Sequence, residues 1–458
     1  MPSTFQSIDI ASSALSALQQ ALDVTGQNVS NVNTPGYTRE VANFVQNPSS
    51  SIWDSQGQQW LGNGVGIADV TRVQSGYLVA LQNSNASDLG KTNAQLSGSQ
   101  QVQSVFNEPS TTGINSALSS FFNAWSALSS NPSDPGTLTQ VQQAGENLTN
   151  LVSGNYTNLA NLQIQNKSQI QGTITQIQTL ANQIGQLNQQ IGQWAGPTPP
   201  NSLMDQRDQA VNQLSQLVDI HTTSMPNGEV GIAVNQFDLV DSAGAHTFPT
   251  QVNAATGTVS DGVSNYNVYG GQLAGEMNFQ NNIVSAQAGL DNLANTLRTS
   301  VNALTTTGTN SLGATGQNFF QAGVGITGAA QFALDPAILS NPGAIPAGVS
   351  GKSGDGGLAE QVFQLQNASQ ASLGNVSITN YYQNLVTGIG QQVSNMQSLK
   401  SSQTAVSSQI QSQIQSISGV NMDTEMASML KYQQAYAAAA KSLSIASQNL
   451  QSLIAMVP

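Results

Sequence analysis

Cysteine is absent from all 458 residues of this chain. That absence excludes a disulfide framework, a thiolate metal site and a cysteine nucleophile. Charge is also scarce, because Asp, Glu, Lys and Arg make up 7% of the residues, against about 25% in ordinary soluble domains. Packing must therefore hold the fold together. We expect a weakly charged polar surface, which suits identical subunits lying side by side in a polymer; an acidic secreted protein is the plain alternative.

Basic residues are few as well. The chain has 10 Lys and Arg against 23 Asp and Glu, a formal net charge of −13, whereas nucleic-acid recognition needs clustered Lys and Arg. The first residues, MPSTFQSIDIASSALSALQQ, contain neither a basic region nor a continuous apolar region, and no run of about 18 apolar residues occurs. We therefore expect no nucleic-acid partner, no Sec signal peptide and no membrane span.

The two ends carry the clearest periodic signal, an apolar residue at every seventh position. The N-terminal row is Ile8, Leu15, Leu22 and Val29, and the C-terminal row is Met422, Met429, Tyr436, Leu443, Leu450 and Val457. This period is typical of coiled-coil helices, and the many Ala and Ser residues around the rows allow close helix packing. We predict that these rows, with Met429 to Val457 at the C-terminal end, form an assembly interface. The alternative is two ordinary core helices of one globular domain.

The middle of the chain mixes long helices with short strands. Heptad stretches over 170–191 and 389–417 and apolar spacing over 281–304 predict a central helical bundle. Residues 37–45 and 65–70 predict the two strands of a hairpin around the GNG run at 62–64, and 219–272 predicts a small β region. The predicted fold class is mainly α, a long-helix bundle whose coiled-coil N- and C-terminal helices pack together, plus a small inserted β region and an N-terminal β-hairpin.

These patterns suggest a division into domains. We expect a terminal assembly domain from 1–75 with 415–458, and a central helical bundle domain from 76–220 with 273–414. Residues 221–272 would be a small β insertion, and 306–357 a Gly-rich irregular segment. In the run GPTPPNSLMDQRDQ, Ser202 is the expected N-cap of a new helix, with Asp205 three residues on in the capping-box position.

Residues that could carry chemistry are sparse. His221 and His246 have neither a second His four residues on nor a Cys to complete a metal site. Asp205, Arg207 and Asp208 form the densest charge cluster; paired carboxylates can do acid and base work, but helix capping and an intrahelical ion pair explain them more simply. We expect no catalytic residue, no cofactor and no metal.

Three runs resemble those of a known family. GQNVSNVNTPGYTRE at 26–40, LGNGVGIADVTR at 61–72 and the run from 416 to 454 resemble the ends of flagellar rod, hook and hook-associated proteins. The run NSLMDQRDQAVNQLSQLVDI at 201–220 is similar to the interior helix of the hook-associated protein 1 family, and FALDPAILSNPGAIPAG followed by GDGGLAEQVFQLQN also fits that family. The large outer β domain of its longer members would be reduced here to 306–357.

The resemblance implies a non-enzymatic structural subunit at the junction between hook and filament. It implies export through the flagellar type III apparatus, an extracellular location, and four kinds of partner: identical subunits in a ring, the hook protein, a second junction protein of the hook-associated protein 3 type, and an export chaperone. Tyr37 belongs to the predicted assembly residues, although it could equally pack within its own chain. The alternatives are a rod or hook subunit and a secreted coiled-coil adhesin.

Overall fold

The computed structural model describes residues 4–54, 57–196, 199–310, 313–352 and 354–455. The chain forms two compact units. Unit 1 comprises Met1–Asp88, Gln176–Phe248 and Gln403–Pro458, and unit 2 comprises Leu89–Thr175 and Pro249–Ser402. The long helices α2 (Gly76–Phe106), α4 (Pro135–Gly192) and α9 (Ile378–Ser418) contribute residues to both.

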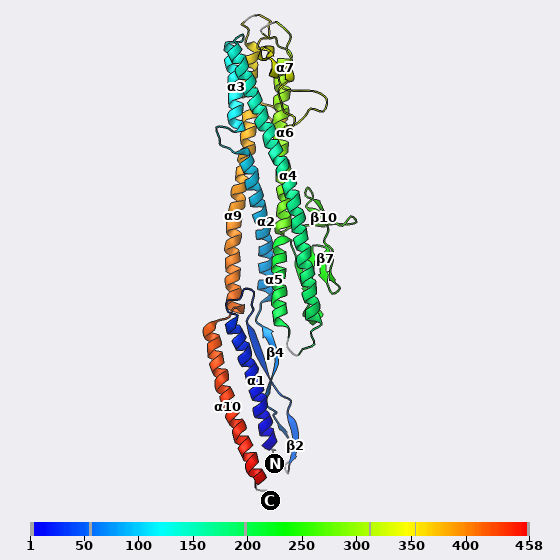
Figure 1. Ribbon diagram of the computed structural model, residues 1–458, viewed down its shortest axis with the longest axis vertical. Coiled ribbons are helices and arrows are strands. Elements are labelled where there is room, and N and C mark those ends of the chain that lie inside the picture. Colours follow the sequence, from blue (N-terminus) through cyan, green and yellow to red (C-terminus); the bar gives the residue numbers. More distant parts are fainter. Residues whose placement is uncertain (1–3, 55–56, 197–198, 311–312, 353, 456–458) are drawn as a thin grey trace. The chain divides into compact units, whose positions relative to one another are not determined.

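The two ends of the chain meet in unit 1. Helix α1 (Thr4–Ser30) and helix α10 (Met422–Ala455) lie side by side (Figure 1). Strands β1 (Glu40–Gln46) and β4 (Val65–Arg72) form an antiparallel pair against α1. The predicted packing of the terminal helices and the predicted N-terminal hairpin are therefore confirmed.

The connection inside that hairpin differs from the prediction. Residues 47–64 are not a simple turn around GNG, because β2 (Ser50–Asp54) and β3 (Gly57–Leu61) pair as a second hairpin between β1 and β4. Gly64 precedes β4 with a φ of 84°, and its carbonyl oxygen accepts a hydrogen bond from the Asn47 amide at 3.0 Å. The glycine run thus places the start of β4 against α1 rather than forming the tip of the hairpin.

The rest of unit 1 contains the predicted small β region. Helix α5 (Asn201–Leu217) leads into a four-stranded antiparallel sheet whose strands follow chain order. The strands are β5 (His221–Ser224), β6 (Val230–Val234), β7 (Phe237–Asp241) and β8 (Gly244–Ala245), with a 3-10 turn η1 (Pro226–Gly228) between the first two. Apolar alternation fits this sheet, since Ile232 and Val234 are buried on one face.

Unit 2 has a dense apolar core. Helix α3 (Ile114–Ser130) packs on α8 (Gly357–Gln364), and α6 (Gly271–Thr305) buries Leu290, Leu293, Leu297 and Val301 completely. The 281–304 spacing therefore predicted a helix correctly. The remaining elements are three short paired strands and several short helices: β9 (Gln251–Asn253), β10 (Thr258–Ser260), β11 (Asn265–Asn267), α7 (Pro336–Ser340), η2 (Pro342–Ala344) and η3 (Ala371–Leu373).

The Gly-rich segment 306–357 contains the short helices α7 and η2, and its aromatic residues form part of this core. Phe319, Phe320 and Phe332 are buried. Asn302 of α6 holds the segment, because its Oδ1 accepts from the amides of Phe319 and Phe320 at 3.0 and 2.9 Å and its Nδ2 donates to the Phe320 carbonyl at 2.8 Å. Arg298, one turn earlier, donates to the carbonyls of Gln321, Gly328 and Gln331. Side chains of α6 therefore form hydrogen bonds with backbone groups of this segment that lie outside any helix or sheet.

Candidate assembly site

The turn after α1 reverses the chain. The Thr34 amide donates to the Asn31 carbonyl at 2.9 Å, the Tyr37 amide donates to the Thr34 carbonyl at 3.2 Å, and Gly36 has a φ of 83°. Such a φ is accessible to glycine at little cost. The reversal at Pro35 and Gly36 returns β1 along α1.

Buried Asn28 of α1 joins three segments of unit 1. Its Nδ2 donates to the Glu40 carbonyl at 2.8 Å and to Glu425 Oε2 at 3.2 Å, and its Oδ1 accepts from the Glu40 amide at 2.9 Å. The Tyr37 hydroxyl donates to the same Oδ1 at 2.8 Å. Burial, with the nearby carboxylates of Glu40, Asp205 and Glu425, raises the pKa of Tyr37, so the hydroxyl stays protonated and donates.

Glu425 of α10 is the acidic partner in this cluster. Its side chain is 3% exposed, and its Oε1 accepts from Arg39 Nε at 2.7 Å. A buried carboxylate needs such partners, since an unpaired charge in the interior is very costly. The Arg39–Glu425 pair therefore fastens the segment before β1 to the start of α10.

A second charge cluster fastens β4 to α5. Arg72 Nη1 lies 2.8 Å from both Asp205 Oδ1 and Asp208 Oδ2. Burial lowers the pKa of Arg72, but Asp208 and Asp205 more than offset this and raise the pKa overall. Asp205 Oδ2 also accepts from the Thr38 amide at 3.1 Å. The hairpin and the turn are thus bound to one face of α5.

The expected capping role of Ser202 and Asp205 is wrong. Helix α5 begins at Asn201, its N-cap residue is Pro200, and no side chain caps it. Asp205 therefore lies past the N-terminal amides, and its carboxylate faces Arg72 instead. The intrahelical ion pair is confirmed, since Arg207 Nη2 lies 2.8 Å from Asp208 Oδ1.

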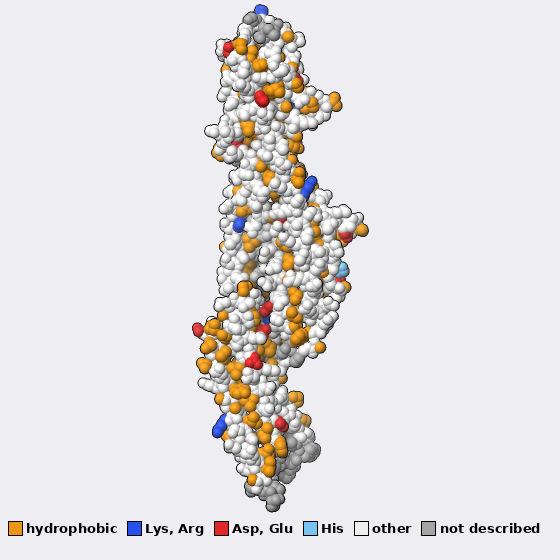
Figure 2. Space-filling model, viewed as in Figure 1, with side chains coloured by type: hydrophobic (Ala, Val, Ile, Leu, Met, Phe, Trp, Pro, Cys, Tyr) orange, Lys and Arg blue, Asp and Glu red, His pale blue; other side chains and the backbone are white. Residues whose placement is uncertain are grey.

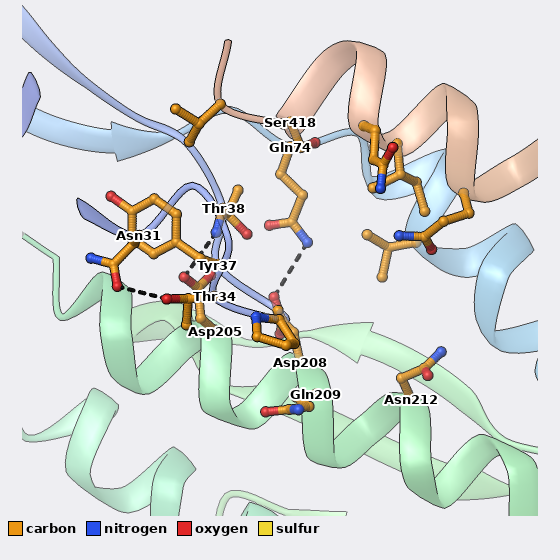
Figure 3. Close-up of a pocket in the computed structure, with 18 of the residues that line it drawn as sticks. Asn31, Thr34, Tyr37, Thr38, Gln74, Asp205, Asp208, Gln209, Asn212 and Ser418 are labelled. Atoms are coloured by element: carbon orange, nitrogen blue, oxygen red, sulfur yellow. Dashed lines mark hydrogen bonds between the residues drawn. The ribbon is translucent and has the colours of Figure 1, made fainter. Parts of the chain in front are cut away.

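A polar pocket of about 540 Å³ lies in unit 1 beside these clusters. Figure 3 shows Thr38 beside Asp205, Gln74 reaching Asp208, and Asn31 joined to Thr34. Among the residues that the structure describes, the carboxylates lining the pocket are those of Asp205 and Asp208, and both are paired with Arg72. The arrangement serves to hold segments together, because both carboxylates are already engaged by Arg72.

The histidines lie elsewhere. His221 is exposed on β5, and His246 Nε2 lies 2.9 Å from Asp241 Oδ2 on the surface. The hydrogen bond from His246, with the backbone amide of Ala243, lowers the pKa of Asp241. In the described ranges, no group of three His, Cys, Asp or Glu side chains could hold a metal ion, and no helix is long and apolar enough to cross a membrane.

The structure places most of the predicted interface residues at partly covered positions on α1 and α10. Ile8, Leu15, Leu22, Val29, Tyr37, Met429, Leu443 and Leu450 are half-buried. Tyr436 is 36% exposed, and Val457 lies outside the described residues. The fully buried positions of α1 are small or polar instead: Ala11, Ala17, Ala21, Thr25 and Asn28.

A further apolar surface on α10 was not singled out from the sequence as a separate face. Met422, Met426 and Leu430 are 41%, 47% and 56% exposed, and their i, i+4, i+8 spacing puts them on one side of the helix. We call these three residues the α10 stripe. Figure 2 shows hydrophobic side chains gathered along α10 on a mostly uncharged surface. Met422 belongs both to the heptad row and to the α10 stripe. The stripe was missed in the sequence because the heptad row was the stronger pattern.

Asn28, Arg39, Arg72 and Glu425 were also missed as site residues. Arg39, Arg72 and Glu425 could have been suspected, because charge is so scarce in this chain that each charged residue near a predicted interface is informative.

Three family models match parts of the chain. The flagellar hook-associated protein FlgK helical domain matches residues 99–320, the flagella basal body rod protein matches residues 8–38, and the flagellar basal body rod FlgEFG protein C-terminal matches residues 411–456. The two end matches include Asn28, Tyr37 and Glu425.

Whole-chain relatives point the same way. The chain is 26% identical over 507 residues to flagellar hook-associated protein 1 of Bacillus subtilis, covering 99% of this chain and 98% of the relative. It is 23% identical over 555 residues to the protein of the same name from Salmonella typhimurium, covering 98% and 99%. The solved structure of the flagellar hook junction protein FlgK from Burkholderia pseudomallei superposes with a TM-score of 0.64 at 17% identity. It covers 74% of this chain and all of that one, which shows a shared fold.

Proposed function

The chain is a member of the flagellar hook-associated protein 1 family, and from this premise we propose that it is a structural subunit joining hook and filament in the bacterial flagellum. One observation carries the proposal at the level of residues. Helix α10 is partly covered by α1 on one side, yet it exposes the α10 stripe on another. A helix that is apolar on more than one side needs more than one neighbour.

The assembly surface that we propose has two parts. The rows of α1 and α10, from Ile8 to Val29 and from Met429 to Leu450, hold the terminal helices together. The α10 stripe then contacts a neighbouring subunit. Weak surface charge favours such contacts, because identical faces do not repel one another strongly. Tyr37 supports this surface from within, through its bond to Asn28.

We propose partners from the same reasoning and the family. They are identical subunits in a ring, the hook protein, a second junction protein of the hook-associated protein 3 type, and an export chaperone. Export through the flagellar type III apparatus without a Sec signal peptide would place the chain outside the cell. A cysteine-free chain suits this route, since no disulfide forms to block the passage of an unfolded chain.

A rod or hook subunit is the second candidate, because the models matching both ends are those of rod proteins. The helical-domain match over residues 99–320 favours the junction instead. We further propose that the chain performs no catalysis and binds no metal. Chelation should then leave its melting temperature unchanged, and a reproducible loss of several degrees on chelation would contradict this.

The test combines a deletion strain with an interface variant. A strain lacking this chain should build hooks without filaments and release flagellin into the medium, and the wild-type gene should restore filaments. Leu430→Asp should fail to restore them, because a carboxylate buried against a neighbour costs several kcal/mol. Its purified form should melt within about 2 °C of wild type, since Leu430 is exposed in the free subunit.

Ser442→Asp is the matched control, since it adds the same charge at an exposed position of α10 that does not share the face of the α10 stripe, and it should restore filaments. Normal filaments with Leu430→Asp would overturn the α10 stripe as an interface. Filaments in the deletion strain itself would overturn the junction role.

A further inference from the structure

A buried glutamate lies between two helices of unit 2. Glu276 of α6 is 2% exposed. Its Oε1 accepts hydrogen bonds from Thr173 Oγ1 of α4 at 3.0 Å and from Gln272 Nε2 at 2.7 Å. Its Oε2 is buried and has no hydrogen-bond partner among the described residues. Oε1 is thus served by two donors, and Gln169 is a third neutral side chain that acts on the carboxyl.

The surroundings of Glu276 are polar but uncharged. Asn166 of α4 donates to the Glu276 carbonyl at 2.9 Å and to Gln280 Oε1 at 3.1 Å, which continues a layer of neutral side chains between the helices. On the α2 side, Gly275 packs directly on the backbone of Lys91. The Lys91 ammonium donates to the Tyr269 carbonyl at 2.9 Å rather than to Glu276.

The charged and titratable residues of the neighbouring elements are Tyr77, Asp88 and Lys91 of α2, Glu146, Tyr156 and Lys167 of α4, Asp291 and Arg298 of α6, Tyr381, Tyr382 and Lys400 of α9, and Asp261, Tyr266 and Tyr269 of the 249–270 segment. The side chains that act on Glu276 are those of Gln272, Thr173 and Gln169, all neutral. In the part of the chain that the structure describes, no cation balances this glutamate.

The other buried glutamate shows what a charged one requires. Glu425 is 3% exposed, like Glu276, but it pairs with Arg39 at 2.7 Å and accepts from Asn28. An ionised carboxylate in an apolar interior without a partner is so costly that the group takes up a proton instead.

We propose that Glu276 is a proton-binding site inside the helical bundle, whose carboxyl is protonated in the folded state, so that folding of unit 2 takes up a proton from the medium. The protonated group is stable there because Oε1 keeps its two donors and Oε2 carries no charge. Burial raises the pKa of Glu276, and the hydrogen bonds from Gln272 and Thr173 only partly oppose this.

The sign of the pH dependence follows from this direction. A carboxyl whose pKa is higher in the folded than in the unfolded chain binds more protons when folded, so stability falls as pH rises between the two pKa values. The stabilisation is complete below the pKa of the unfolded chain and is lost as pH rises through the folded pKa. Within that window the folding equilibrium constant should fall by about tenfold per pH unit for this one group.

Equilibrium urea unfolding of the full chain from pH 4 to pH 9 tests the proposal. Glu276→Gln keeps the shape and hydrogen bonds of a protonated carboxyl and cannot ionise. In wild type the urea concentration at half-unfolding should fall as pH rises. In Glu276→Gln this fall should be absent, and at alkaline pH the variant should need more urea than wild type to unfold. Glu146→Gln, at an exposed position of α4 in the same unit, should follow wild type. If the urea midpoints of Glu276→Gln and wild type change with pH in the same way, the proposal is wrong.

A direct titration covers the case in which Glu276→Gln does not fold. Burial also raises the pKa of Glu40, so the resonance of Glu276 is identified by its loss in Glu276→Gln or its shift in Thr173→Val. Carbon-13 labelling of glutamate carboxyl carbons in the wild-type protein should show this resonance titrating above the ordinary range. If every glutamate titrates in the ordinary range, Glu276 is ionised in the folded chain and the proposal is wrong.

Discussion

The terminal helices and the aromatic core of unit 2 differ in which residue types they bury. In unit 2, Phe121, Trp125, Phe319 and Phe320 are completely buried, with ring centroids 5.0 to 5.7 Å apart for the pairs involving Phe319. In α1 and α10 the large apolar residues are half-buried or exposed, and the buried positions are Ala, Thr, Asn and Glu. The aromatic core of unit 2 is buried, whereas the terminal helices leave apolar surface exposed.

Polar links also secure the terminal segments in the free chain. Asn28, Glu425 and Arg39 join α1, the turn and α10, and Arg72 joins β4 to α5 through two carboxylates. Polar links fix geometry and orientation at small net gain in stability. Four predictions test this contrast, from the largest expected effect to the smallest.

Phe121→Ala should have the largest effect, because it opens a cavity inside a fully buried aromatic cluster. We expect a loss of about 3 to 5 kcal/mol in the free energy of unfolding, measured by urea denaturation. The control is Phe5→Ala on α1, where the ring is exposed and the loss should stay within about 0.5 kcal/mol. Equal losses at the two positions would remove the contrast between the regions.

Arg72→Met should come next, with a local loss of about 3 kcal/mol, because it leaves Asp205 and Asp208 without their partner in a largely buried setting. Protease should then cut the β1–β4 hairpin faster while unit 2 resists as before. Lys431→Met, which removes the same charge from an exposed position, is the control. Adding Asp205→Asn should restore part of the protection, and no restoration would argue against the pairing.

Gly64→Ala should cost about 1 to 3 kcal/mol. Its φ of 84° is unfavourable for alanine, and a methyl group would overlap Ser13 Oγ while lying 3.2 Å from the Cα of Ile10. Hydrogen exchange of β1 and β4 amides should show the loosened hairpin. Gly62→Ala is the matched control, because a methyl there meets only the flexible end of Gln46 at 3.4 Å. A hairpin as protected as wild type would show that α1 does not restrain this turn.

The smallest expected effects come from replacing a helical glycine with alanine in each of the two regions. Gly26 lies inside α1, where a methyl group would meet nothing within 4 Å beyond the backbone of its own helix, so Gly26→Ala should stabilise the chain by about 0.5 to 1 kcal/mol through helix propensity. Gly98 lies inside α2, where a methyl would overlap the Phe279 ring, so Gly98→Ala should destabilise despite the same propensity gain. Thermal melts of the two variants should therefore move in opposite directions; shifts of the same sign would break the comparison.

Local patterns predicted the elements well. The isoleucines at 170, 177, 184 and 191 are all buried in α4, because a seven-residue apolar period is a property of neighbouring turns of one helix. The reversal at Pro35 and Gly36 also depends only on the conformations open to those two residues. Element type, the meeting of the two ends and the fold class could therefore be predicted from the sequence.

The interior of the hairpin and the start of α5 could not be predicted in this way. The GNG run resembles a hairpin turn in the sequence, but β2 and β3 form a further hairpin between β1 and β4. Ser202 and Asp205 matched a capping box, but α5 starts one residue before Ser202 and Asp205 faces Arg72. Both errors arose where a local motif competes with contacts from distant segments.

By itself the sequence determined that this chain is a cysteine-free, weakly charged helical protein with apolar terminal helices, since composition and period are readable residue by residue. Only the tertiary structure decided which charges meet. Arg72 pairs with Asp205 across 133 positions of sequence, Glu425 meets Arg39 across 386, and Glu276 meets no cation in the described residues. The physical reason is that the energy of a buried charge depends on its neighbours in space, and folding alone determines which residues those are.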